Sequence, residues 1–86
     1  MKLRTESVSW REIDGEMVIL DLESSTYMKT NESGSTLIRM LVEERSMDEL
    51  VQSLVDAYDV PAEEASEDAG AFVAMLRERN LLETTA

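Results

Sequence analysis

The residue types that most often carry out catalysis or bind transition metals are absent from this sequence. It has no histidine and no cysteine, so the commonest general base, the best nucleophile and the usual zinc ligands are missing. Carboxylates alone could hold Mg²⁺ or Ca²⁺, but no D-x-D-x-D-G loop occurs. The three glycines, Gly15, Gly34 and Gly70, form neither a P-loop nor a dinucleotide-binding motif. We therefore expect no catalytic residues, no metal site, no cofactor and no enzymatic activity.

The charge balance argues against a nucleic-acid ligand. Eight basic and 19 acidic residues give a formal net charge of −11, which repels phosphate backbones. No apolar run approaches the roughly 20 residues needed to cross a bilayer, and the first six residues lack the apolar stretch of a secretory signal. The sequence predicts a cytoplasmic protein that binds neither nucleic acid nor membranes.

The length of 86 residues fits a single domain, residues 1–86, with a core from about residue 8 to residue 82. Its first third has the pattern of β-strands. Two apolar runs, 8–13 and 16–22, are separated by Asp14-Gly15, a dipeptide typical of tight hairpins. The second run is apolar on both faces, as in a central strand, and a short alternating segment, 26–30, follows as an edge strand. These features predict a three-stranded antiparallel sheet.

Three helices are predicted after the sheet. Asn31 is a good N-cap for a helix that runs to about Arg45. Ser46 and Glu49 form a capping-box pattern before an amphipathic segment that ends near Tyr58.

The third helix has Pro61 at its first turn and ends at Asn80, a residue that tolerates the left-handed conformation. Strands followed by helices predict an α+β fold of the winged helix-turn-helix-like kind. Such domains usually bind DNA through a basic helix. Here the third helix is mostly acidic, with Glu63, Glu64, Glu67, Asp68 and Glu78 against Arg77 and Arg79.

Several short motifs follow one another between about Trp10 and Leu82. They are 18–27 (VILDLESSTY), 31–34 (NESG), Leu37-Ile38 with Leu41, 47–50 (MDEL), 58–61 (YDVP), and Asp68, Phe72 and 76–79 (LRER). Their order and spacing resemble the PqqD-like recognition elements of ribosomally synthesised and post-translationally modified peptides (RiPPs). At two positions the sequence departs from the family, because Thr30 stands where leucine is common and Ile38 where an aromatic residue is common.

This resemblance implies a protein that captures the leader region of a precursor peptide. In the family, the leader adds a strand to the edge of the sheet and packs against the third helix. A chain made of this domain alone resembles the stand-alone recognition protein of a lasso-peptide pathway, where its partners would be a leader peptidase and a cyclase. A peptide chaperone of the quinone-cofactor pathway is a further possibility.

The strand at 26–30 comes last in the sheet and leaves an unpaired edge, to which an extended peptide can bind through main-chain hydrogen bonds. Side chains on this strand and on the third helix would then form the walls of the site. The predicted leader-binding residues are Thr26, Tyr27, Met28, Lys29, Thr30, Asp68, Ala71, Phe72, Met75 and Arg79.

Some of these residues have an alternative structural role. Phe72 also fits the buried stripe of its helix, and Met75 lies beside that stripe. Asp68 and Arg79 could be ordinary solvated charges, and Lys29 could protect an edge strand from aggregation.

Two other functional classes compete with peptide binding. An acyl carrier protein needs a serine at a helix start, whereas Ser53 lies within a predicted helix. A regulatory or scaffold winged-helix domain would bind a folded protein instead of a peptide. The open edge also permits either a monomer or a weak homodimer.

Overall fold

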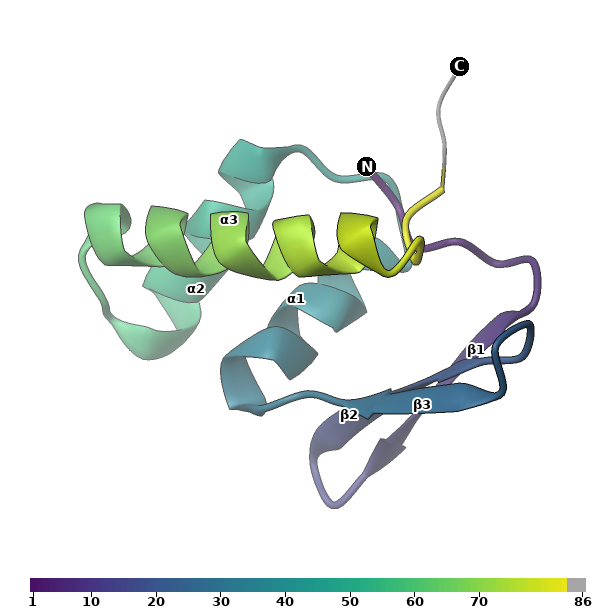
Figure 1. The fold of residues 1–86 in the computed structure, drawn as a ribbon. Coiled ribbons are helices and arrows are strands. Elements are labelled where there is room, and N and C mark those ends of the chain that lie inside the picture. Colours follow the sequence, from purple (N-terminus) through teal and green to yellow (C-terminus); the bar gives the residue numbers. More distant parts are fainter. Residues whose placement is uncertain (84–86) are drawn as a thin grey trace.

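The computed structural model describes residues 1–83, in which one sheet is covered on a single face by helices (Figure 1). The predicted α+β fold, a three-stranded antiparallel sheet followed by three helices, is confirmed. The elements are β1 (Val8–Ile13), β2 (Glu16–Asp21), β3 (Thr26–Lys29), α1 (Glu32–Leu41), α2 (Met47–Tyr58) and α3 (Ala62–Glu78).

The predicted hairpin joins β1 to β2. Asp14 and Gly15 have φ angles of 52° and 82°, the positive values that a two-residue type I′ turn requires. The strand order is β1-β2-β3, so β2 is central as its apolar pattern predicted. Leu22 lies just beyond β2, and 64% of its surface is exposed.

The two faces of the sheet have different environments. Cross-strand partners share a face, and Ile19 of β2 is paired with Trp10 and Met28 on the face beneath the helices. Ile19 is only 1% exposed, and Trp10 packs against the core. Leu20 is paired with Tyr27 on the opposite face, which no helix in residues 1–83 covers.

The first helix ends earlier than predicted, at Leu41 instead of Arg45. It begins as expected, because the side chain of Asn31 accepts a hydrogen bond from the backbone N–H of Gly34 at 2.8 Å. Beyond Leu41 the chain turns towards the N-terminal segment, and the backbone N–H of Arg45 donates to the carbonyl of Met1 at 2.8 Å. This tertiary pairing replaces the last helical turn.

The other helix boundaries lie at or within a few residues of the predicted ones. Ser46 and Glu49 form a complete capping box, and the hydrogen bond from the Ser46 backbone N–H lowers the pKa of the Glu49 carboxyl group. Asp59, with φ of 52°, ends α2 in the left-handed region. Pro61 immediately precedes α3, and Asn80 follows it with φ of 58°.

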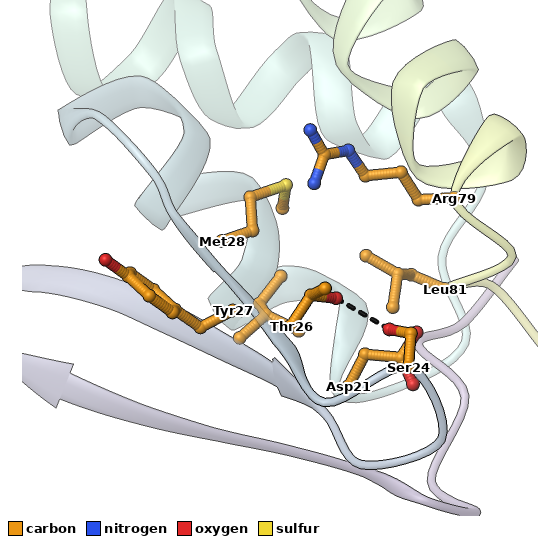
Figure 2. Close-up of a pocket in the computed structure, with 8 residues that line it drawn as sticks. Asp21, Ser24, Thr26, Tyr27, Met28, Arg79 and Leu81 are labelled. Atoms are coloured by element: carbon orange, nitrogen blue, oxygen red, sulfur yellow. Dashed lines mark hydrogen bonds between the residues drawn. The ribbon is translucent and has the colours of Figure 1, made fainter.

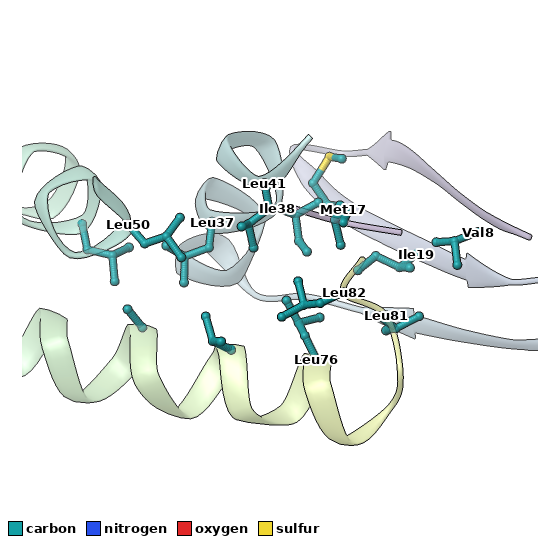
Figure 3. Close-up of a cluster of buried hydrophobic side chains, with 14 of the residues drawn as sticks. Val8, Met17, Ile19, Leu37, Ile38, Leu41, Leu50, Leu76, Leu81 and Leu82 are labelled. Atoms are coloured by element: carbon teal, nitrogen blue, oxygen red, sulfur yellow. The ribbon is translucent and has the colours of Figure 1, made fainter. Parts of the chain in front are cut away.

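The hydrophobic core lies between the sheet and the helices (Figure 3). It extends further towards the N-terminus than predicted, because Leu3 is completely buried. Leu3 forms an antiparallel bridge with Leu82, and its N–H donates to the carbonyl of Leu41 at 2.8 Å. The buried apolar residues are Leu3, Val8, Met17, Ile19, Leu37, Ile38, Leu41, Leu50, Leu54, Ala65, Ala69, Val73, Leu76, Leu81 and Leu82.

A buried polar cluster joins the end of β3 to β2 and α1. The Thr30 hydroxyl donates to the carbonyl of Met17 at 2.9 Å and lies 2.7 Å from the Ser35 hydroxyl. The Ser35 hydroxyl oxygen also accepts from the backbone N–H of Met17 at 2.8 Å. Thr30 can therefore occupy a position where the family often has leucine, because its hydroxyl group has partners inside the protein.

We expect replacement of Ser35 by alanine to lower the free energy of unfolding by about 1–3 kcal/mol, because the buried N–H of Met17 would lose its partner. Urea denaturation followed by circular dichroism measures this change. Ser33→Ala is the matched control, because Ser33 bonds only at the exposed start of α1. Equal effects of the two variants would contradict the prediction.

Candidate peptide-binding site

The outer edge of β3 offers unpaired main-chain groups. The N–H of Thr30 donates to Met17, so Thr30 faces β2. Neighbouring residues of a strand direct their N–H and C=O groups to opposite edges, which makes Met28 face β2 as well. The backbone groups of Tyr27 and Lys29 therefore point outward, and no strand in residues 1–83 pairs with them.

A first pocket, of about 310 Å³, lies where the start of β3 faces the end of α3. In Figure 2 the side chains of Met28 and Arg79 extend towards each other across this pocket, from β3 and from the end of α3. Tyr27 projects away from them, as the alternation along a strand requires. The residues that line this pocket are Ile19, Asp21, Ser24, Thr26, Tyr27, Met28, Arg79 and Leu81.

A second pocket, of about 360 Å³, lies between the start of α1 and the middle of α3. Gly34 allows the two helices to approach closely there, because a Cβ atom at this position would lie 3.0 Å from Cε1 of Phe72. The residues that line it are Asn31, Ser33, Gly34, Leu37, Asp68, Ala71, Phe72 and Met75.

The structure divides the predicted site residues between these pockets. Thr26, Tyr27, Met28 and Arg79 line the first, and Asp68, Ala71, Phe72 and Met75 line the second. Their contact with a peptide stays a prediction.

Two predicted residues line neither pocket. Lys29 is exposed and its ammonium group lies 3.4 Å from the Glu16 carboxylate. Thr30 is only 5% exposed, and its hydroxyl group is engaged within the protein. Its side chain therefore supports the strand from inside the protein, and the contact of Thr30 with a peptide stays a prediction.

The wall that α1 contributes was not predicted from the sequence. Asn31 is the cap of α1 and also lines the second pocket, together with Ser33, Gly34 and Leu37. Leu81 of the first pocket was missed because it lies beyond the predicted third helix. The glycine at the start of α1 was the available signal, since it permits close approach of another element.

Asp21, at the edge of the first pocket, is held in its ionised form. Partial burial favours the neutral acid, but hydrogen bonds, including one from the backbone N–H of Glu23 at 3.1 Å, outweigh this and lower the pKa of Asp21. The Arg4 guanidinium group lies 3.5 Å from the Asp21 carboxylate and 3.0 Å from the Glu23 carboxylate, so it balances part of their negative charge.

The described part of the chain contains no group of carboxylates arranged to hold a metal ion. No helix in residues 1–83 combines the length and apolar character needed to cross a bilayer.

Comparison with known proteins identifies the family. The family described as "Coenzyme PQQ synthesis protein D (PqqD)" matches residues 16–82, which is most of the chain. The chain belongs to the PqqD family. The resemblance to PqqD-like recognition elements predicted from the sequence is thereby confirmed. Among curated proteins, none is similar enough to count as a match.

Two solved structures resemble this PqqD-family chain over nearly its whole length. The structure of TbiB1 in complex with the TbiA(beta) leader peptide is 30% identical in sequence, with a TM-score of 0.88, and the match covers 100% of this chain and 99% of that one. A lasso peptide synthetase B1 complexed with the leader peptide is 29% identical, with a TM-score of 0.81 and 93% of each chain covered. Both relatives were therefore solved with a leader peptide bound.

Proposed function

We propose that this protein binds the leader region of a ribosomally synthesised precursor peptide and presents it to the leader peptidase and the cyclase of a lasso-peptide pathway. The observation that carries this proposal is the unpaired edge of β3 beside two pockets. It occurs in a chain that resembles two proteins solved with leader peptides, over 100% and 93% of its length. The protein acts by binding alone.

Main-chain hydrogen bonds from the outward groups of Tyr27 and Lys29 would hold the leader as a fourth strand. Alternate leader side chains would then point towards α3 and the pockets. The remaining side chains would extend the uncovered face of the sheet. The two pockets would then recognise the side chains on one face of the leader strand, and the side chains on its other face would stay accessible.

The uncovered face of the sheet supports contact with a partner protein. Ile13, Leu22 and Tyr27 are 46%, 64% and 72% exposed, and Tyr27 and Leu22 line a shallow hollow of about 260 Å³. Leu22 and Tyr27 lie together at this hollow, whereas Ile13 lies at the other end of the sheet, beside the β1–β2 turn. Exposed apolar patches are typical of protein interaction sites. A peptidase bound there would lie directly beside the added leader strand.

A titration with fluorescent synthetic leaders, with and without their core regions, tests the proposal. We expect saturable binding in the micromolar range or tighter, about −8 kcal/mol or better, that survives removal of the core. A folded protein that binds no leader would instead favour the regulatory or scaffold function with a folded partner.

A second candidate is a peptide chaperone in synthesis of the quinone cofactor, which the description of the matched family favours. The same titration distinguishes the two candidates, because the tighter leader identifies the pathway.

Shortening Met75 to alanine should weaken leader binding by about 1–3 kcal/mol, because its side chain lines the second pocket. Phe72→Ala should have a similar effect on affinity and also lower stability, so circular dichroism must accompany it. Met47→Ala is the control, since Met47 packs against the core but lines neither pocket. Unchanged affinity in folded Met75→Ala would place the leader elsewhere.

A further inference from the structure

The two pockets along α3 carry opposite charges. Arg79 lines the first pocket together with Thr26, and Asp68 lines the second together with Asn31. The helical rise of 1.5 Å per residue separates Asp68 from Arg79 by about 16 Å along the α3 axis. An extended strand covers the same distance from Thr26 to Asn31, at about 3.3 Å per residue. The charged pair therefore spans the free edge of β3 and extends past it to the start of α1.

Neither charge has a partner within residues 1–83. Every salt bridge there uses Arg4, Lys29, Arg39, Arg45 or the amino group of Met1, and the acidic partners do not include Asp68. Both Arg79 and Asp68 are exposed.

The other charged groups near β3 are already engaged. Asp21 borders the first pocket, but Arg4 lies 3.5 Å from its carboxylate. Lys29 extends from the opposite face of the sheet and pairs with Glu16. Arg79 and Asp68 are thus the charged residues of the two pockets that remain available to a ligand.

We propose that these two residues select the direction and register of the bound peptide through its charges. A leader strand antiparallel to β3 would pass the second pocket first. It would carry a basic side chain opposite Asp68 and an acidic side chain opposite Arg79, about four or six residues further on. The number is even because successive side chains of a strand point to opposite faces, so two side chains on the same face are an even number of residues apart. This inference rests on the proposed strand addition.

The charges supply information that the main-chain hydrogen bonds lack. Backbone groups repeat along every strand, so they fix neither the direction nor the register of an added peptide. A leader bound in the reverse direction would place its acidic side chain beside Asp68 and its basic side chain beside Arg79. Both contacts would be repulsive, and repulsion in the wrong arrangement is an effective source of specificity.

Selection from a display library of random peptides of about 16 residues, with the folded full chain as bait, tests the inference. We expect bound peptides to be enriched in Lys or Arg followed by Asp or Glu at the stated spacing. The same selection with Arg79→Glu should replace the acidic preference by a basic one. Arg77→Glu is the matched control, because Arg77 is on the same helix and lines neither pocket.

Individual peptides make the test quantitative. Arg79→Glu should lower the affinity for a selected peptide about three- to tenfold. Replacement of the peptide's acidic residue by a basic one should restore binding. Asp68→Lys should act in the same way on the basic residue, with Glu67→Lys as its control. Selected peptides without this charge pattern would overturn the inference and leave leader binding intact. Failure to select any peptide would overturn both.

Discussion

Replacement of Lys29 by proline is expected to weaken leader binding at least thirtyfold, about 2 kcal/mol or more, without unfolding the protein. The N–H of Lys29 points to the free edge of β3, so proline removes a donor that the added strand needs. The pyrrolidine ring would also occupy the space of the incoming backbone. Proline is tolerated on an edge strand whose N–H faces solvent.

Lys29→Ala separates this effect from the loss of the side chain. Alanine keeps the outward N–H, and the ion pair with Glu16 is exposed, so the change in affinity should stay below about threefold. Fluorescence polarisation with a labelled leader gives both affinities, and circular dichroism verifies the fold. Tight binding by folded Lys29→Pro would exclude strand addition at this edge.

The largest effect on stability is expected from Leu76→Ala, a loss of about 2–5 kcal/mol in the free energy of unfolding. Leu76 is completely buried near the end of α3, among core side chains from the sheet and from the segment after the helix (Figure 3). Small domains are stable by only about 5–15 kcal/mol in total. The variant should therefore be partly unfolded at moderate urea concentrations.

Leu22→Ala is the matched control, because Leu22 is 64% exposed and its removal should cost less than about 0.5 kcal/mol. Urea denaturation followed by circular dichroism compares the two variants. A loss below about 1 kcal/mol for Leu76→Ala would mean that α3 does not depend on this contact.

Local features of the fold could be predicted from the sequence because their causes are local. The Asp14-Gly15 turn depends on two residues that accept positive φ, and the capping box of α2 depends on Ser46 and Glu49. Asn80 likewise follows the end of α3 because asparagine accepts the left-handed backbone conformation.

Contacts between distant parts of the chain could not be predicted in this way. The end of α1 at Leu41 depends on pairing with the N-terminal segment, which no pattern near Leu41 reveals. The burial of Thr30 depends on a hydroxyl partner, Ser35, supplied by another element.

The candidate site was predictable where it follows one element. The free edge follows from the order of the strands, and the α3 residues follow from helical spacing between Asp68 and Met75. The contribution of α1 required the close approach at Gly34, a property of two packed helices and not of either sequence segment.

The bridge between Leu3 and Leu82 has a consequence for how the protein folds. It joins residues at opposite ends of the described chain, and such non-local contacts raise the contact order and slow folding. The segment that pairs with residues 2–4 also contains Leu81, a wall of the first pocket. We therefore expect that pocket to form late, so that a chain emerging from the ribosome acquires its affinity for peptide only after Leu82 has left the ribosome.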